Sequence, residues 1–322
     1  MDSLIAVVGP TASGKSDLAL DIACALAPAP HKPNELVGII NADASQLYRG
    51  MDIGTAKIPV DDRRGIEHAQ IDVLHVTDEA SVAAYQRYAC ADVDRIAGSL
   101  RQPIVVGGSG LYVRAVTDYF EFPGTDRDLR RKIDNRVDAE GLNAVYRELE
   151  RKDPESAQKI DSSNRRKIVR ALEVMELTGH KFSASLPPYV DRIPTCHLAI
   201  RTNREGLNAR IVRRAQAMFE GGLVEETERL LQEGLREGPT ASKAIGYSQA
   251  IAVIDGVMNE HEAIEATAVA TRKLASRQLK WFRRDPRITW LDLEMDEHGE
   301  VPDWAWEALV SQAMDTIDRR KR

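Results

Sequence analysis

In the first third of the chain, short apolar runs alternate with longer stretches in which apolar residues recur at helical spacing. The runs cover 4–8, 36–42 and 103–108, and the longer stretches cover 16–27 and 81–98. Short, continuously apolar runs are typical of strands buried on both faces, and their alternation with helices predicts a parallel sheet with crossover helices. Ser81 is a candidate N-cap of the second helix.

The pattern changes near residue 124, where the chain becomes charged and helical and shows no strand-like run. This change predicts a helical insertion over 124–189, inside a core that consists of 1–123 and 190–322. A strand over 195–201 should return the chain to the sheet. The other predicted elements are helices at 204–220, 223–234, 246–256, 260–284 and 302–320 and a strand at 288–293.

Composition narrows the class of protein. Of the 322 residues, 43% are hydrophobic and 29% are charged, which is typical of a packed globular interior and excludes bulk disorder. The net charge of −6 argues against a protein covered with nucleic-acid-binding surface. The three cysteines show neither a disulfide framework nor zinc-ligand spacing. No basic leader precedes the first run and no run approaches the roughly 18 apolar residues of a membrane span, so we expect a cytoplasmic protein.

Residues 9–16, GPTASGKS, stand between the first predicted strand and the first predicted helix. They match G-x-x-x-x-G-K-[ST], a pattern whose backbone N–H groups hold phosphate oxygens at a helix N-terminus. Lys15 adds a positive charge, and the Ser16 hydroxyl can ligate Mg²⁺. The sequence therefore predicts an α/β fold, with a P-loop NTPase-like parallel sheet flanked by helices and an all-helical insertion domain. The loop alone does not say what its phosphates are attached to.

Asp43 comes directly after the second predicted strand, at the sheet edge where ligands bind in open α/β folds. A carboxylate there can hold a metal ion or accept a proton, and it can also simply cap a helix.

Several longer motifs resemble the tRNA dimethylallyltransferases, also called tRNA isopentenyltransferases. The resemblance covers nearly the whole chain, and its motifs follow in the order of that family. The motifs are the phosphate loop, YRGMDIGTAK at 48–57, VGGSGLY at 106–112, RALEV at 170–174, IGY at 245–247 and TRKLASRQLKWFRR at 271–284.

The resemblance implies transfer of a dimethylallyl group from dimethylallyl diphosphate to N6 of the adenosine on the 3′ side of a tRNA anticodon, position 37. It implies Mg²⁺ as cofactor, pyrophosphate held by the loop, and the anticodon stem-loop as partner. Separately from the resemblance, we expect a monomer. The chain departs from the family pattern mainly at the expected tRNA contacts. The departures are Ala44, Ser109, Ser163, Asn164, Lys167 and Ser248.

The resemblance also implies roles for individual residues. Asp43 is the candidate general base beside N6, with Lys15 and Ser109 as further catalytic candidates, although Ser109 can equally cap the next helix. His68 matches a family histidine, and we expect it to be structural. The residues expected at the diphosphate are Gly9, Pro10, Thr11, Ala12, Ser13, Gly14, Lys15 and Ser16 with Arg210 and Arg214, two arginines that can equally be surface residues of a solvated helix.

A cationic stripe is predicted on the helix that contains 271–284. At about 100° per residue, its six arginines and lysines fall within roughly 140° of arc, and Leu274, Leu279 and Phe282 fall on the other side. Such a stripe suits RNA phosphates, although an ordinary amphipathic surface helix is the simpler alternative. The RNA contacts expected from stripe, insertion and family motifs are Asp43, Ala44, Ser45, Gln46, Ser109, Arg130, Arg166, Lys167, Arg170, Lys243, Gly246, Tyr247, Arg272, Lys273, Arg277, Gln278, Lys280 and Arg283.

Three other functions stay open on the sequence. A P-loop small-molecule kinase would use the same loop, but no arginine-bearing lid is evident. A nucleotide-regulated RNA-binding adaptor would tolerate loss of Asp43. A prenyltransferase acting on free nucleotides would not need the basic surfaces.

Overall fold

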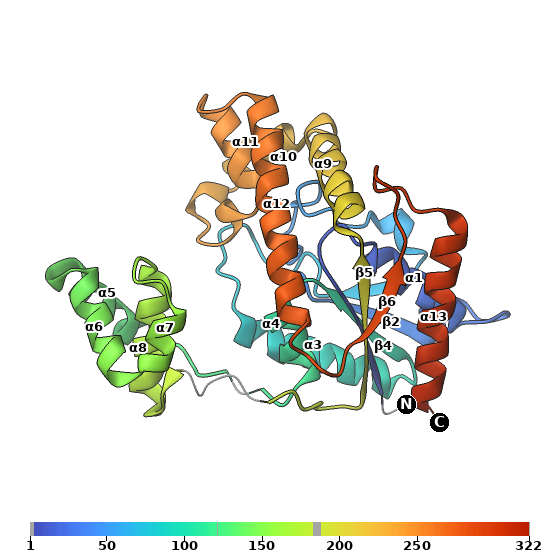
Figure 1. The fold of residues 1–322 in the computed structure, drawn as a ribbon, viewed down its shortest axis with the longest axis horizontal. Coiled ribbons are helices and arrows are strands. Elements are labelled where there is room, and N and C mark those ends of the chain that lie inside the picture. The colour runs from blue at the N-terminus through green and yellow to red at the C-terminus, as the bar shows by residue number, and fades with distance from the viewer. Residues whose placement is uncertain (1–2, 121, 183–187, 322) are drawn as a thin grey trace. The chain divides into compact units, whose positions relative to one another are not determined.

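The computed structural model describes residues 3–120, 122–182 and 188–321, and its centre is one sheet of six parallel strands (Figure 1). The strand order is β3-β2-β4-β1-β5-β6, which is the predicted P-loop NTPase-like architecture. Short β3 was not predicted, because its three half-buried residues at the sheet edge form no apolar run. The strands are β1 (Leu4–Val8), β2 (Val37–Asn41), β3 (Glu67–Ala69), β4 (Gln102–Gly107), β5 (Thr195–Thr202) and β6 (Thr289–Leu293).

Helices cover both faces of the sheet. Alternate residues of the central strand, such as Ile5 and Val7, pack with Leu18 of α1 (Lys15–Ala25) and Leu309 of α13 (Asp303–Lys321). Helices α3 (Val82–Gly98) and α4 (Gly110–Thr117) pack together against β2, β4 and β1. Strands sandwiched in this way are buried on both faces, which explains their continuous apolar runs. The predicted cap of α3 is confirmed, because the Ser81 hydroxyl accepts from the Ala84 amide.

Four further helices follow β5 and pack on one another (Figure 1). Helix α9 (Arg204–Glu220) lies along α12 (Glu260–Phe282), while α10 (Leu223–Gln232) packs on α11 (Tyr247–Ile254). The shorter elements are α2 (Pro33–Leu36), η1 (Val60–Arg63), η3 (Leu235–Glu237) and η4 (Ala241–Lys243). Among the described residues, no helix is both long and apolar enough to cross a bilayer.

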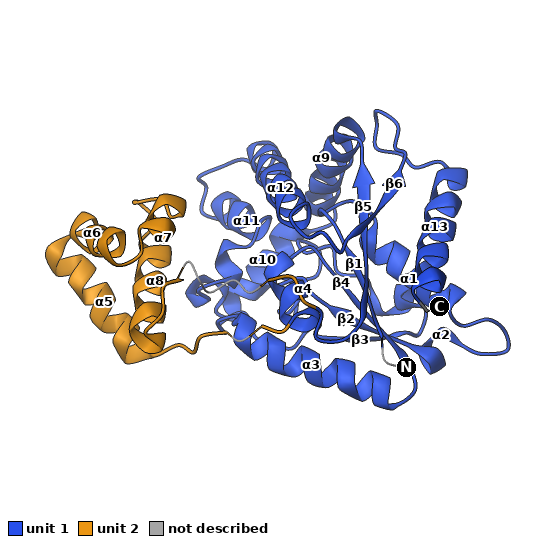
Figure 2. Cartoon of the chain, turned by 60° about the horizontal axis from the view of Figure 1, so that its bottom comes forward, with its two compact units in different colours: residues 1–118, 191–322 blue, residues 119–190 orange. Residues whose placement is uncertain are grey.

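The chain divides into two compact units (Figure 2). The first comprises Met1–Asp118 with Asp191–Arg322, and the second is Tyr119–Val190, whereas the sequence pattern places the insertion at 124–189. Described residues of the second unit contain helices and no strand: α5 (Arg127–Glu140), α6 (Leu142–Lys152), α7 (Pro154–Lys159) and α8 (Arg165–Thr178). These helices enclose a core of their own around Ile133, Leu149 and Ile168, as expected of a domain.

An ion network joins the two points where the chain leaves and re-enters the first unit. Arg287 donates from Nη1 to Asp118 at 2.9 Å and to Asp191 at 2.6 Å. Asp118 also accepts from Arg114 at 2.5 Å, and a ring nitrogen of His197 lies 2.8 Å from Asp191. Because Asp118 is fully buried, these partners are needed to hold its charge.

Candidate active site

Three loops with functional side chains meet at the carboxyl edge of the sheet. They follow β1, β2 and β4, and these strands are neighbours in the order β2-β4-β1. The strands are parallel, so the phosphate loop, Asp43 and Ser109 are brought to one edge. The strand order, which no local sequence pattern states, therefore assembles the predicted site.

The phosphate loop adopts a backbone that requires glycine. Gly9 has φ 146° and Gly14 has φ 89°, and a Cβ on Gly14 would lie 3.0 Å from the Trp306 ring. Helix α1 begins directly after Gly14, so the loop presents the N-terminus of that helix. The arrangement can bind a diphosphate through backbone amides.

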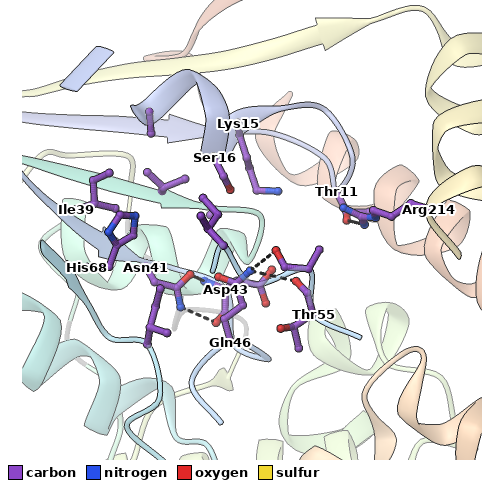
Figure 3. A pocket seen from close by; sticks show the side chains of 16 residues that line it. Thr11, Lys15, Ser16, Ile39, Asn41, Asp43, Gln46, Thr55, His68 and Arg214 are labelled. Carbon is purple, nitrogen blue, oxygen red and sulfur yellow. Dashed lines mark hydrogen bonds between the residues drawn. The ribbon is translucent and has the colours of Figure 1, made fainter. Parts of the chain in front are cut away.

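A pocket lies against this loop (Figure 3). Its polar lining includes Lys15, Ser16 and Asp43, and its apolar lining includes Ile39 and Val106. Such a pocket can hold a ligand with an anionic head and a short hydrocarbon tail. Its other lining residues are Thr11, Ala19, Asn41, Gln46, Thr55, Ala56, Ile58, His68, Ile71, Gly107 and Arg214.

The basic groups of the pocket are partly desolvated. Burial lowers the pKa of Lys15 to about 8, although the nearby Asp43 carboxylate opposes the shift. Burial also lowers the pKa of Arg214, which keeps its charge because an arginine titrates far above neutral pH. At pH 7 both groups are cations in a low-dielectric wall, where an anion is held more strongly than at an exposed surface.

His68 is a neutral group in this wall. Its Nδ1 donates to the carbonyl of Ile66 at 2.9 Å, and burial lowers its pKa. Its side chain also lines the first pocket, and its structural role stays a prediction.

Asp43 is oriented by the loop that carries it. Its amide donates to Oδ1 of Asn41 at 3.0 Å, and its own Oδ1 accepts from the Ser45 amide at 3.0 Å. Asn41 is buried, and its side-chain amide also donates to the Gln70 carbonyl at 2.9 Å. Asn41 is not among the residues predicted for the site, although its polar side chain at the end of an apolar run was a usable signal.

Ser109 occupies the N-cap position of α4, and its side chain supports the Asp43 loop. Its hydroxyl accepts from the Ala44 amide at 3.3 Å, and its side chain makes no cap hydrogen bond to α4. The predicted cap is therefore met by the backbone alone: the Ser109 carbonyl accepts from the Tyr112 amide at 2.8 Å and the Val113 amide at 3.0 Å, while the hydroxyl bonds elsewhere. Ser109 links the loop after β4 to the Asp43 loop, and it is not among the lining residues of the pocket.

A second pocket adjoins the first and shares four lining residues with it: Thr11, Asp43, Thr55 and Arg214. The rest of its lining is largely apolar and comes mainly from α9 and α12, with Met218 and Leu274 as examples. The buried hydroxyl of Thr267 also lines it and has no hydrogen-bond partner among the described residues. Asp43 and Arg214 thus face both pockets. This geometry suits two substrates that bind in adjoining pockets and react beside these residues.

The two arginines proposed at the diphosphate lie in different surroundings. Arg214 lines both pockets and donates to the Thr11 hydroxyl. Arg210 lines neither pocket; its Nη1 is buried near Gly14, and no partner is found for that nitrogen among the described residues. The geometry therefore favours Arg214 as the residue that meets a ligand.

Comparison with known proteins identifies the family. The model of the family described as IPP transferase matches residues 46–285, which is most of the chain. A tRNA dimethylallyltransferase of Nocardioides sp. is 50% identical over 317 residues, covering 98% of this chain and 97% of that protein. This chain belongs to the tRNA dimethylallyltransferase family. A family member from Mycobacterium tuberculosis is 48% identical over 292 residues. The match spans 89% of this chain and 91% of that protein.

Solved structures of the family agree with the fold. A tRNA isopentenylpyrophosphate transferase of Bacillus halodurans superposes with a TM-score of 0.69 at 32% identity, covering 100% of this chain and 98% of its own. A eukaryotic dimethylallyltransferase solved while acting on tRNA has a TM-score of 0.79 at 24% identity, covering 99% and 80%. That second likeness concerns the fold alone.

The predicted cationic stripe lies on α12. Lys273, Arg277, Lys280 and Arg283 are exposed and Arg272 is half-buried. The structure gives these side chains no acidic partner among the residues that it describes. Together with Arg204 of α9 they line a wide groove, so the stripe is a free cationic surface.

Three residues predicted to contact RNA lie inside the first unit. Tyr247 is fully buried, Gly246 is buried beside it, and Gln278 is 7% exposed. The side chains of Tyr247 and Gln278 are therefore covered by neighbouring protein, and Gly246 has no side chain to present. Lys243 is exposed. In the loop after β2, the Ala44 amide is bonded to Ser109, Ser45 lines the second pocket and Gln46 lines the first.

Within the second unit, the predicted RNA contacts divide into two kinds. Arg130 and Arg170 both pair at 3.0 Å with the fully buried carboxylate of Glu173, so they stabilise the unit itself. Arg166 and Lys167 are exposed. Asn164, one of the departures from the family pattern, caps α8 by accepting from the Lys167 amide at 3.1 Å.

The described residues contain no group of three acidic, histidine or cysteine side chains that would hold a metal by itself. The Ser16 hydroxyl lines the first pocket beside the loop. Mg²⁺ is usually bound through one or two protein oxygens, with phosphate and water as its other ligands. The site therefore fits Mg²⁺ that arrives with a diphosphate.

Proposed function

We propose that this protein transfers the dimethylallyl group of dimethylallyl diphosphate to N6 of the adenosine that follows the anticodon of a tRNA. The observation that carries the proposal is the pair of pockets that share Asp43, Thr11, Thr55 and Arg214. The pocket beside the phosphate loop suits the prenyl diphosphate. The pocket between α9 and α12 suits a flat purine base that has left its stack.

The reaction forms two bonds and breaks two. N6 of adenine attacks C1 of the dimethylallyl group, and the C1–O bond breaks with its electron pair leaving on pyrophosphate. N6 then loses a proton, and the carboxylate of Asp43 accepts it. The Ser45 amide and Asn41 orient the loop that carries this carboxylate, so Asp43 meets N6 at little entropic cost.

The basic groups act on the leaving group. Lys15, Arg214 and the loop amides stabilise the negative charge that grows on pyrophosphate. Mg²⁺ bound by the Ser16 hydroxyl and the diphosphate would supply further charge neutralisation. The apolar lining excludes water, which would otherwise capture an allylic cation-like carbon.

The exposed stripe on α12, with Arg204 of α9, suits the phosphates of the anticodon stem-loop. A single chain carries both pockets and the stripe, which supports a monomer as the active form. Arg166, Lys167 and Lys243 are further candidates for phosphate contacts because they are exposed.

The test is a product analysis. Purified protein is incubated with Mg²⁺, dimethylallyl diphosphate and unmodified tRNA whose anticodon is followed by adenosine, and the RNA is then digested and its nucleosides are weighed. One adenosine should gain a C5H8 unit, and pyrophosphate should appear in equal amount. Consumption of ATP without any change in nucleoside mass would support the kinase instead, and modification of free AMP but not tRNA would support the free-nucleotide enzyme.

A further inference from the structure

Gln278 makes a contact that neither its predicted role nor its family motif explains. Its side-chain Oε1 accepts from the backbone amide of Thr11, inside the phosphate loop, at 2.8 Å. The two residues lie 267 positions apart, on α12 and after β1. Burial strengthens this hydrogen bond, and loss of the acceptor would leave a loop amide unpaired.

The same side chain is packed tightly against the loop after β4. A Cβ on Gly108 would lie 2.3 Å from Nε2 of Gln278 and 3.2 Å from the Gly9 carbonyl oxygen. Trp281 lies one turn beyond Gln278 on α12, and a Cβ on Gly110 would lie 2.1 Å from its ring. The absent side chains of the two glycines therefore let α12 seat directly on the loops that hold the site.

Thr11 connects Gln278 to a residue that lines the pocket. Its hydroxyl accepts from Arg214, which lines both cavities. Gln278, Thr11 and Arg214 form a chain of two hydrogen bonds that joins α12, the phosphate loop and α9. Displacement of the first link would move the guanidinium that faces the diphosphate.

We propose that Gln278 is a positioning residue for the phosphate loop, acting from the helix whose opposite face carries the cationic stripe. The proposal rests on the proposed function, because it assigns Gln278 to the diphosphate half of that site. Gln278 touches neither substrate; it fixes the Thr11 amide and, through Thr11, the direction of Arg214.

The test compares Gln278→Met, which keeps the length of the side chain but removes the acceptor, with Gln312→Met, the same change at an exposed position of α13. For each variant we would measure KM for dimethylallyl diphosphate, kcat, the Kd for the anticodon stem-loop RNA, and hydrogen exchange of the loop peptide that contains Thr11. Thermal unfolding shows whether each variant is folded.

Gln278→Met should raise KM for the diphosphate roughly tenfold, as expected for one unpaired buried amide. It should also speed exchange of the Thr11 peptide and leave the Kd for RNA within about twofold, since no charge of the stripe changes. Gln312→Met should match the wild type in every measurement. The proposal would be overturned if Gln278→Met folds but leaves both the KM for dimethylallyl diphosphate and the hydrogen exchange of the Thr11 peptide unchanged.

Failure of the proposal and failure of the proposed function are distinguishable. If the wild type does not prenylate tRNA, the function is wrong. If it does, and Gln278→Met binds both substrates normally, only the role of Gln278 is wrong. If Gln278→Met does not fold, Gly108→Ala takes its place. Inorganic pyrophosphate then competes with dimethylallyl diphosphate for the wild type and for Gly108→Ala, and the two affinities are compared. The added methyl displaces Gln278, so wild-type affinity in Gly108→Ala would also overturn the proposal.

Discussion

Tyr247 donates its phenolic hydrogen to Glu226 at 2.5 Å, and both side chains are buried. The carboxylate also accepts from the amides of Asp52 and Ile53, which precede the Thr55 segment of both pockets. A Cβ on Gly54 would lie 2.4 Å from the Tyr247 ring, so the tyrosine packs flush against that backbone. Burial, followed by the charge of Glu226, raises the pKa of Tyr247 far above its ordinary value, which keeps the phenol a donor.

Tyr247→Phe should therefore lower the free energy of unfolding by about 1–3 kcal/mol, because Glu226 loses a partner that water cannot replace. Tyr88→Phe is the control, since Tyr88 is 61% exposed and should lose less than about 0.5 kcal/mol. Urea unfolding of both variants measures the difference. Equal stability of the two would contradict the assignment.

Asp43→Asn should lower kcat by about 10²–10⁴, because an amide cannot accept the N6 proton. The substitution keeps the size of the side chain and an oxygen for the Ser45 amide, so the Kd for tRNA should change little. Single-turnover prenylation and filter binding measure the two quantities. Asp61→Asn, an exposed change on η1, serves as control, and a comparable loss of kcat there would argue against a specific role for Asp43.

Diphosphate affinity should fall above pH 8. Lys15 has its pKa lowered to about 8, so its cation is present below that pH and is lost as the pH rises through it. The diphosphate binds the protonated form of Lys15. Its affinity for the protein at pH 9 should therefore be about tenfold weaker than at pH 7. Lys15→Arg keeps its charge across this range and should show no such decline in a binding titration. A decline that persists unchanged in Lys15→Arg would assign the titration to another group.

The double variant Arg277→Ala, Lys280→Ala should weaken tRNA binding without changing KM for the diphosphate. Each lost phosphate contact should reduce the slope of log Kd against log salt by about 0.7–0.9. Arg319→Ala removes an exposed arginine from α13 and should leave the slope unchanged. Salt titrations by filter binding distinguish the variants, and identical slopes would remove the stripe from the RNA interface.

Arg287→Met should destabilise the first unit by about 3 kcal/mol, because buried Asp118 loses one of its cations. Arg201→Met breaks a pair with Asp292 whose side chains are both more than half exposed, and it should cost less than about 1 kcal/mol. Chemical unfolding compares the buried and the exposed pair directly. A loss in Arg287→Met no larger than in Arg201→Met would show that the network carries no net stability.

The local pattern determined five of the six strands and the phosphate loop. β1 begins and ends where its apolar run does, and four other strands agree within one residue, because burial on both faces requires a continuous apolar run. Gly9, Gly14, Lys15 and Ser16 were recognisable because the loop needs those residue types at fixed spacing. The cationic stripe was equally readable, since helical periodicity alone sorts its charges onto one face.

Only the tertiary structure decided which of these residues act together. The order β2-β4-β1 brings Asp43, Ser109 and the phosphate loop to one edge of the sheet. The packing of α9 and α12 forms a second pocket beside the first, and Asp43 lines both. It also places Arg214, but not Arg210, in both pockets, and it buries Gln278 and Tyr247 under neighbouring protein. Sequence periodicity reports which face of a helix is buried, but the partner of a buried polar side chain depends on contacts between segments that lie far apart in the chain.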